Sequence, residues 1–193
     1  MKYVATLPGG SASNWTCVAP CDHGVQMYES DDAFVDALAH YVADGLVAGE
    51  GVVVIATGEH RATLEHRLES RGLNLEAARR RDQYVAVDAE QTLTQFMVNE
   101  WPDERRFDAA VSTLVSRARG RKNRRVRAFG EMVVLLWNRG HHGATVRLEH
   151  LCRRICQLQS FALFCAYPKR AFTEGTHASL LQIGATHTHV VPS

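Results

Sequence analysis

The chain has 193 residues, of which 46% are hydrophobic and 22% are charged, and its formal net charge at pH 7 is +1. This length suits one domain with a sizeable core, and the composition is that of a globular protein rather than a disordered one. A net charge close to zero excludes an overall field that would attract nucleic acid or a membrane surface.

The sequence predicts a soluble, cytoplasmic protein without a membrane segment. Its longest apolar runs have the length of strands, well short of what spans a bilayer. Residues 1–22 lack the apolar stretch of a signal peptide and are predicted to form a flexible arm before a single domain at 23–193. The five cysteines are an odd number and include Cys165 in an apolar run, which favours free thiols in a reducing compartment.

Strand-like and helix-like segments alternate after the arm. The predicted strands are 23–28, 52–56, 84–88, 126–132, 161–167 and 187–191. The first predicted helix begins at an N-cap in 30–32 and ends at Gly49, and the second contains Leu64 and Leu68. Further helices are predicted over 89–100, 107–118 and 178–181. A long amphipathic helix before the fifth strand has Leu148, Leu151, Cys152, Ile155 and Leu158 facing inward. Such alternation predicts a three-layer α/β/α fold with a mostly parallel central sheet.

Several polar and aromatic residues stand at the carboxyl ends of the predicted strands, where open parallel sheets bind ligands. They are Tyr28, Glu29, Thr57, Asp88, Glu131, Met132 and Tyr167. Rings, carboxylates and a thioether together suit a partly apolar pocket with a few polar anchors. We therefore expect a small organic ligand at this edge of the sheet.

Glu131 is the leading candidate for ligand contact because it stands where a strand gives way to an apolar segment. A carboxylate there is either buried with a partner or directed at a ligand. Arg127 lies four residues earlier in the same predicted strand and therefore projects from the same face. The alternative is a structural ion pair of Arg127 with Glu131 or with Glu149.

His23 begins the first predicted strand, at the end opposite the expected crevice. We interpret it as a half-buried histidine with satisfied hydrogen bonds, although a histidine there could also face a partner or titrate near neutral pH. The turn that follows this strand, 28–32, is acidic and lacks glycine and lysine, so it would repel a phosphate group. Nucleotide hydrolysis is not expected.

Three pairs of residues are candidate metal ligands: Cys152 with Cys156, His141 with His142, and His187 with His189. None matches a zinc signature, and two cysteines one turn apart on an apolar helix face are usually core residues. The sequence accordingly predicts no metal site, no cofactor and no catalytic residue.

The segment 117–127 contains six arginines and one lysine, mostly in a predicted loop. A solvated loop is the common interpretation, and the alternative is a docking patch for an acidic partner or for a nucleic-acid backbone. No aromatic residues interleave with these charges and no helix-turn-helix pattern accompanies them, which argues against sequence-specific DNA recognition.

Blocks of this sequence resemble the MEDS family of sensory domains. The resemblance lies in 23–29, 45–57, 126–132, Leu136 with Trp137, Leu148 with Glu149, 165–168 with Phe172, and 187–190. It implies a RecA/KaiC-like fold without a Walker A loop. The recurrent polar and aromatic positions of the family fall on His23, Tyr28, Glu29, Arg127, Glu131, Trp137, Glu149 and Tyr167.

The resemblance further implies small-molecule sensing in prokaryotic signal transduction or transcription regulation, with simple hydrocarbon derivatives as the ligands. Output would pass through a partner protein, such as a histidine kinase, an anti-sigma factor or a transcription regulator, or through a change in oligomeric state such as a homodimer. Two rivals remain. One is a protein–protein interaction module without a ligand, and the other is a small enzyme that uses Glu131 as acid or base.

Overall fold

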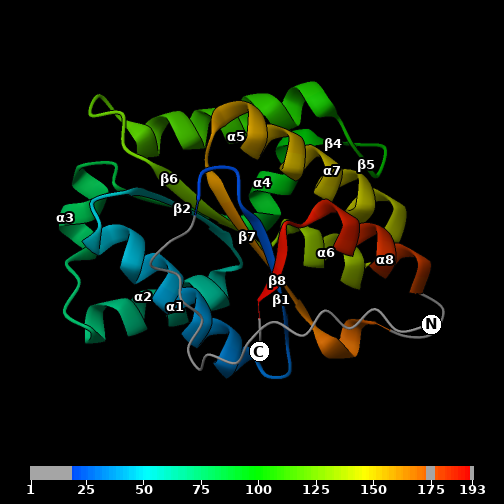
Figure 1. The fold of residues 1–193 in the computed structure, drawn as a ribbon, viewed down its shortest axis with the longest axis horizontal. Helices are drawn as coiled ribbons and strands as arrows, with labels where there is room; N and C mark the ends of the chain where they lie inside the picture. Colours follow the sequence, from blue (N-terminus) through cyan, green and yellow to red (C-terminus); the bar gives the residue numbers. More distant parts are fainter. Residues whose placement is uncertain (1–18, 173–176, 192–193) are drawn as a thin grey trace.

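A computed structural model describes residues 19–172 and 177–191 and shows an α/β fold with a six-stranded parallel sheet (Figure 1). The strand order is β3-β2-β6-β7-β1-β8, and every pairing in this sheet is parallel. The strands are β1 (His23–Tyr28), β2 (Gly51–Ala56), β3 (Tyr84–Asp88), β6 (Val126–Gly130), β7 (Ala162–Pro168) and β8 (His189–Val191). The predicted fold class is confirmed.

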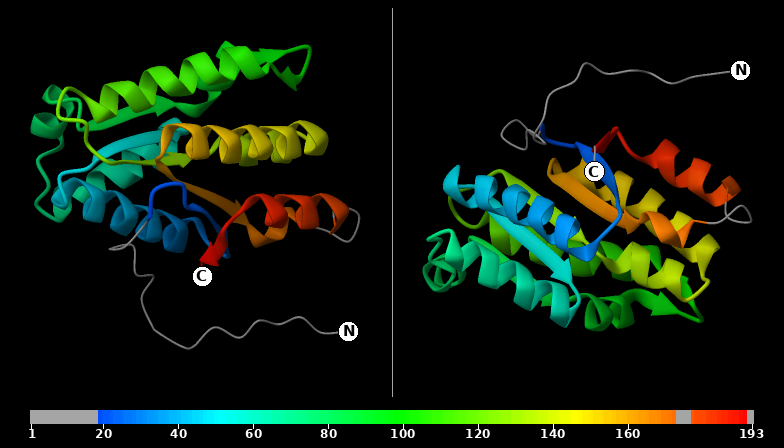
Figure 2. Two further views of the ribbon diagram at one scale, coloured as in Figure 1. Left: turned by 45° about the horizontal axis from the view of Figure 1, so that its top comes forward. Right: turned by 90° about the horizontal axis from the view of Figure 1, so that it is seen from below.

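Helices cover both faces of the sheet, as the two turned views show (Figure 2). They are α1 (Asp31–Val47), α2 (Gly58–Ser70), α3 (Leu75–Arg80), α4 (Ala89–Phe96), α5 (Glu104–Arg119), α6 (Met132–Asn138), α7 (His142–Gln159) and α8 (His177–Thr186). A short 3-10 helix, η2 (Lys169–Ala171), follows β7. No helix in the described ranges has both the length and the apolarity needed to cross a bilayer.

The central strands form because their residues are apolar on both faces. Every residue of β2 and β7 is buried, as expected for strands that have helices above and below them. One core lies between the sheet and α1 to α3, and includes Phe34, Leu38, Leu64 and Leu68. The second core lies on the opposite face, under α4 to α8.

Side-chain caps fix where several helices begin. Ser30 Oγ accepts a hydrogen bond from the Ala33 N–H at the start of α1. Asp88 and Asp103 do the same at the starts of α4 and α5. Asp88, one of the residues expected at the carboxyl edge of the sheet, therefore has a local capping role.

The boundaries of several predicted elements were wrong. The fourth predicted strand ends at Gly130 rather than at Met132. Glu131 is the N-cap of the apolar helix α6, so Met132–Asn138 is helical. The helix predicted over 89–100 ends at Phe96, where β4 (Met97–Val98) and β5 (Trp101–Pro102) form a small antiparallel hairpin. The short helix α3 was not predicted, and α8 is longer than predicted.

The predicted N-terminal arm lies mostly outside the described residues. Its last residues, 19–22, are attached to the strand β7 and the residue before it: the Cys21 N–H donates to the Phe161 carbonyl at 3.1 Å, and the Leu163 N–H donates to the Asp22 carbonyl at 2.7 Å. The chain is therefore held to the sheet before β1 begins.

Candidate functional site

A crevice of about 390 Å³ opens at the carboxyl ends of four strands of the sheet. Tyr28 ends β1, Thr57 follows β2, Glu131 follows β6, and Pro168 ends β7, and all four residues line the crevice. The volume is within the range of small-molecule sites, which is roughly 300–1,000 Å³.

The crevice lies where neighbouring strands send their next helices to opposite faces. After β2 the chain enters α2, whose Leu64 and Leu68 pack in the core shared with α1. After the adjacent β6 it enters α6, whose Met132 and Val133 pack in the other core. Such divergence leaves a gap beyond the strand ends, which is the usual ligand position in open α/β sheets.

Glu131 is held at the bottom of this gap by hydrogen bonds from β2 and α2. Its N–H donates to the Ile55 carbonyl at 2.9 Å, which extends the β2–β6 pairing by one residue. The carboxylate accepts from the Thr57 N–H at 2.7 Å and from the Thr57 hydroxyl at 3.1 Å. Thr57 precedes α2, so the negative charge also lies near the positive end of that helix.

His60 completes the cluster from the first turn of α2. Its Nδ1–H donates to Glu131 Oε1 at 2.7 Å, and its side chain remains 18% exposed. This hydrogen bond raises the pKa of His60 above its ordinary value, against the opposing effect of burial, and Asp31 and Glu59 raise it further. Because Nδ1 is occupied by Glu131, Nε2 is the nitrogen through which His60 can meet a ligand.

The stability of the protein should depend on the protonation of His60. Because the pKa is raised in the folded state, the His60–Glu131 contribution is fully present below the unfolded pKa of histidine and is lost as the pH rises through the folded pKa. Urea unfolding of wild type and His60→Asn should therefore differ most in mildly acidic solution and converge in alkaline solution. A constant difference across this range would contradict the assignment.

The remaining walls of the crevice are mixed in character. Val35, Val134 and Leu135 contribute apolar surface, and Asp31, Glu59 and Arg170 line the same space. The Tyr28 ring stacks on Phe34 with centroids 4.8 Å apart, and Phe34 in turn meets the His60 ring edge-on at 5.1 Å. Burial, followed by Asp31 and Glu131, raises the pKa of Tyr28 to about 12, so the phenol keeps its proton as a donor.

Three of the predicted ligand-binding residues, Tyr28, Thr57 and Glu131, thus lie together in the crevice. Four others lie elsewhere. Glu29 is exposed and forms an ion pair with Lys169 at 2.8 Å, and Met132 is in the core under α6. Trp137 is buried and donates its indole N–H to the Ala171 carbonyl, and Tyr167 is fully buried with its hydroxyl on Glu149.

Arg127 is not among the residues that line the crevice, and its ion-pair partner is Glu50 rather than the expected Glu131 or Glu149. Its Nε–H donates to Glu50 Oε2 at 2.6 Å, and Nη1–H donates to the Tyr41 carbonyl at 2.9 Å. Arg127 occupies the second position of β6, where the strand begins, while Glu131 lies beyond its end. Sharing a face was therefore not sufficient to bring the two side chains together.

His23 and Glu149 are both fully buried, which corrects the expectation of a half-buried histidine. They meet beneath the sheet, away from the residues that line the crevice. Cys21, Cys152, Cys156 and Cys165 are free thiols, and Cys17 is outside the described residues.

Much of the basic segment 117–127 serves local structure. Arg117 pairs with Asp82, Arg119 donates to the Gln159 carbonyl, and Arg124 donates to the Ala118 and Arg81 carbonyls. These contacts favour a structural interpretation of the segment over a docking patch.

His60 was missed by sequence reasoning because only strand-end positions were considered. It lies three residues after Thr57, within the first turn of the helix that the strand β2 enters. A histidine in that turn was a usable signal, since the first turn after a strand borders the same crevice.

A family model described as MEDS, the MEthanogen/methylotroph, DcmR Sensory domain, matches residues 22–188. No curated protein matches the sequence. The match covers most of the chain, including five of the six strands of the sheet but not β8, and so includes both ends of the Thr57–Glu131 contact. The chain belongs to the MEDS family of sensory domains.

Proposed function

We propose that this chain senses a small organic molecule that binds in the crevice at the carboxyl edge of the sheet. The observation that carries the proposal is the ordered His60–Glu131 pair, which borders an open space of about 390 Å³. A sensory family explains why a fold of this type would keep such a space without a phosphate-binding turn.

The walls of the crevice suggest which chemistry the ligand carries. A short apolar part would pack on Val35, Val134 and Leu135, and a hydroxyl, carbonyl or carboxylate would meet His60 Nε2. The Tyr28 phenol offers a further donor in the lining of the same crevice. Simple oxygenated hydrocarbons with a short chain fit this combination of surfaces.

Ligand binding would act on the helices α2 and α6, whose first residues meet at the His60–Glu131 pair. Glu131 starts α6 and Thr57 starts α2, so a ligand that contacts His60 bears on helices from both faces of the sheet. A ligand that prefers one arrangement of these helices would shift the population toward it. A histidine kinase, an anti-sigma factor, a transcription regulator or a second copy of the chain would read the difference.

Thermal unfolding in the presence of a panel of short alcohols, ketones and carboxylic acids tests the proposal. A binder present at about 100 times its Kd should stabilise the wild type by about 2.7 kcal/mol. His60→Asn and Glu131→Gln should lose most of this stabilisation. His66→Asn is the matched control, because His66 is an exposed histidine of the same helix and lies outside the crevice lining.

Two results would reject the proposal. One is stabilisation that survives unchanged in both crevice variants, and the other is the absence of stabilisation by any compound of the panel. The same samples, followed by proton NMR, separate sensing from catalysis: a bound compound that is consumed would identify the His60–Glu131 pair as an acid–base pair.

A further inference from the structure

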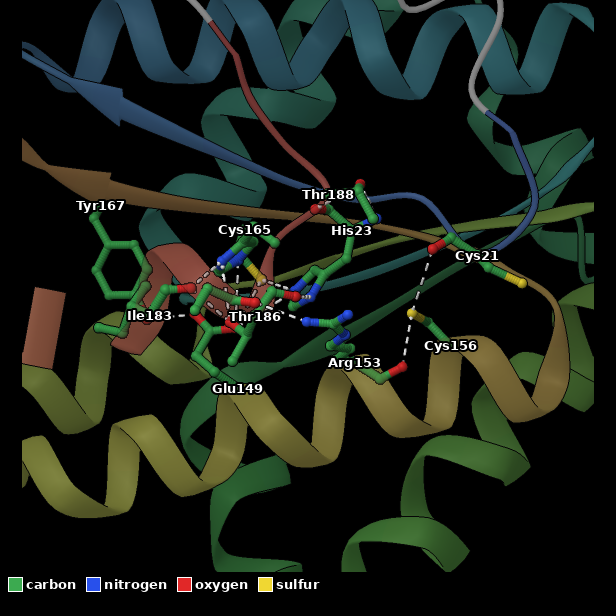
Figure 3. Close-up of polar contacts among 12 residues, drawn as sticks. Cys21, His23, Glu149, Arg153, Cys156, Cys165, Tyr167, Ile183, Thr186 and Thr188 are labelled. Atoms are coloured by element: carbon green, nitrogen blue, oxygen red, sulfur yellow. Dashed lines mark hydrogen bonds and ion pairs between the residues drawn. The ribbon is translucent and has the colours of Figure 1, made fainter. Parts of the chain in front are cut away.

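Four buried side chains from separate parts of the sequence converge beneath the sheet, on the face covered by α7 and α8 (Figure 3). They are His23 at the start of β1, Glu149 in α7, Cys165 in β7, and His187 just after α8, and we call them the His23 cluster. One ligating atom from each lies within 4.8 Å of the others, and the His23 and Glu149 side chains are 0% exposed.

The separations within the His23 cluster resemble those around a tetrahedral ion. Glu149 Oε2 lies 3.4 Å from His23 Nε2 and 3.4 Å from His187 Nε2. His23 Nε2 lies 3.4 Å from Cys165 Sγ, which is 3.9 Å from Glu149 Oε2. Ligands of a tetrahedral zinc ion, at its usual bond lengths, are about 3.3 Å apart for nitrogen and oxygen and about 3.6 Å apart when one is sulfur.

Backbone contacts fix the tautomer of both imidazoles. His23 Nδ1 lies 3.1 Å from the Thr186 carbonyl, and His187 Nδ1 lies 2.7 Å from the Ile183 carbonyl. A carbonyl only accepts, so each Nδ1 carries the hydrogen and each Nε2 presents a lone pair to the cluster. Metal-bound histidines are held in this way, with the second ring nitrogen donating to a backbone carbonyl or a carboxylate.

The lone pair on His187 Nε2 has no hydrogen-bond donor among the described residues. Within the described part of the chain, His187 Nε2 is a buried atom without a hydrogen-bond partner. Glu149 Oε2 lies 3.4 Å from it, and a carboxylate oxygen is itself an acceptor unless protonated. A cation between these atoms satisfies all of them at once; without one, the Cys165 thiol can donate to His23 Nε2, and His187 Nε2 is satisfied only by a proton on Glu149.

The surroundings supply the second layer of contacts that metal sites need. The Tyr167 hydroxyl donates to Glu149 Oε1 at 2.5 Å, which leaves Oε2 for the cluster. The nearby Arg153 guanidinium is directed to the Ala185 carbonyl, at 2.7 Å, rather than to Glu149 (Figure 3).

We propose that His23, Glu149, Cys165 and His187 bind one divalent transition-metal ion of the zinc type. Two imidazole nitrogens, a thiolate and a carboxylate oxygen form a donor set that zinc accepts, and four protein ligands leave no open position. The ion joins β1, β7, α7 and the segment after α8, so it fastens the C-terminal part of the chain to the sheet. On binding, Cys165 releases its thiol proton to solvent and Sγ bonds to the metal.

No spacing pattern could reveal this site. The four ligands are separated along the sequence by 126, 16 and 22 positions, as their residue numbers show, and no two of them form a short motif. The histidine pair considered from the sequence, His187 with His189, contributes one ligand only, because His189 is exposed.

The test uses the reduced full-length chain, stripped of metal by a chelator and titrated with Zn²⁺ and with Co²⁺. We expect one Zn²⁺ per chain, measured by elemental analysis after gel filtration, and a higher unfolding temperature with metal. Co²⁺ should give the visible absorption of a tetrahedral ion together with a thiolate-to-metal band in the near ultraviolet. This spectrum is read on the wild type, so it remains informative if a variant fails to fold.

Two variants of the proposed ligands and two control variants locate the site. Cys165→Ser should abolish the thiolate band, and His187→Gln should weaken Zn²⁺ binding at least tenfold, while circular dichroism checks that both remain folded. His189→Gln is the matched control and should bind as the wild type does, and His60→Asn should also bind normally, since it affects only the crevice. Failure of the folded wild type to bind either ion, or binding that persists in both Cys165→Ser and His187→Gln, would overturn the proposal.

Discussion

Leu148→Ala is expected to lower the free energy of unfolding by about 2–5 kcal/mol, measured by urea denaturation. Leu148 is fully buried on the inner side of α7, in the core beneath β6 and β7. The substitution removes apolar contacts and leaves a cavity that the packed helix and sheet cannot fully close.

Leu158→Ala on the same helix is the matched control. The sequence pattern predicts that Leu158 faces inward, but its side chain is 69% exposed, so this substitution should change stability by less than about 0.5 kcal/mol. Equal losses from the two leucine substitutions would mean that α7 packs in a different rotation from the one described.

Arg127→Met is expected to cost about 3–5 kcal/mol of unfolding free energy, because it removes the buried partner of Glu50 and leaves that carboxylate beside the more exposed Arg125, at 3.8 Å. Both side chains are largely buried, at 3% and 11% exposure, and Arg127 also lies over the Tyr41 ring with a centroid distance of 5.0 Å. Gly45 is part of this arrangement, since a Cβ there would come within 2.6 Å of the arginine Cδ.

A double-mutant cycle separates the ion pair from the packing of the arginine. Arg127→Met combined with Glu50→Gln should lose less stability than the sum of the single changes, since no uncompensated charge remains. Arg117→Met serves as the surface control: its ion pair with Asp82 is about half exposed, and its loss should cost at most about 1 kcal/mol. Additive effects of Arg127→Met and Glu50→Gln would contradict a coupled pair.

Arg127 and Glu131 show what the alternation of residues along a strand can predict and what it cannot. Alternation along a strand predicts that residues four apart share a face, but β6 ends at Gly130 and Glu131 has helical backbone angles, and the pattern does not say how far the strand extends or which neighbours lie above each end. Arg127 therefore meets Glu50 near the amino end of the sheet, and Glu131 meets Thr57 and His60 at the other end.

Most of the crevice residues could be predicted from one general rule, which places ligands at the carboxyl ends of parallel strands. Tyr28, Thr57 and Glu131 could be grouped from the sequence because parallel strands place their carboxyl ends at one edge. Tyr167 stands near the end of its strand as well, yet it turns into the core and donates to Glu149. The pleat decides such cases, because adjacent strand residues point to opposite faces and a single residue shifts the outcome.

The sequence by itself determined the α/β class, the positions of the six sheet strands and the family, because apolar runs and helical periodicity are local properties and the family blocks follow one another along the chain. Tertiary structure alone decided the strand order, the partners of Arg127 and the convergence of His23, Glu149, Cys165 and His187. These features depend on how segments that are separated along the sequence pack together in space. Packing of this kind is a cooperative property of the whole core, and no short stretch of the chain encodes it.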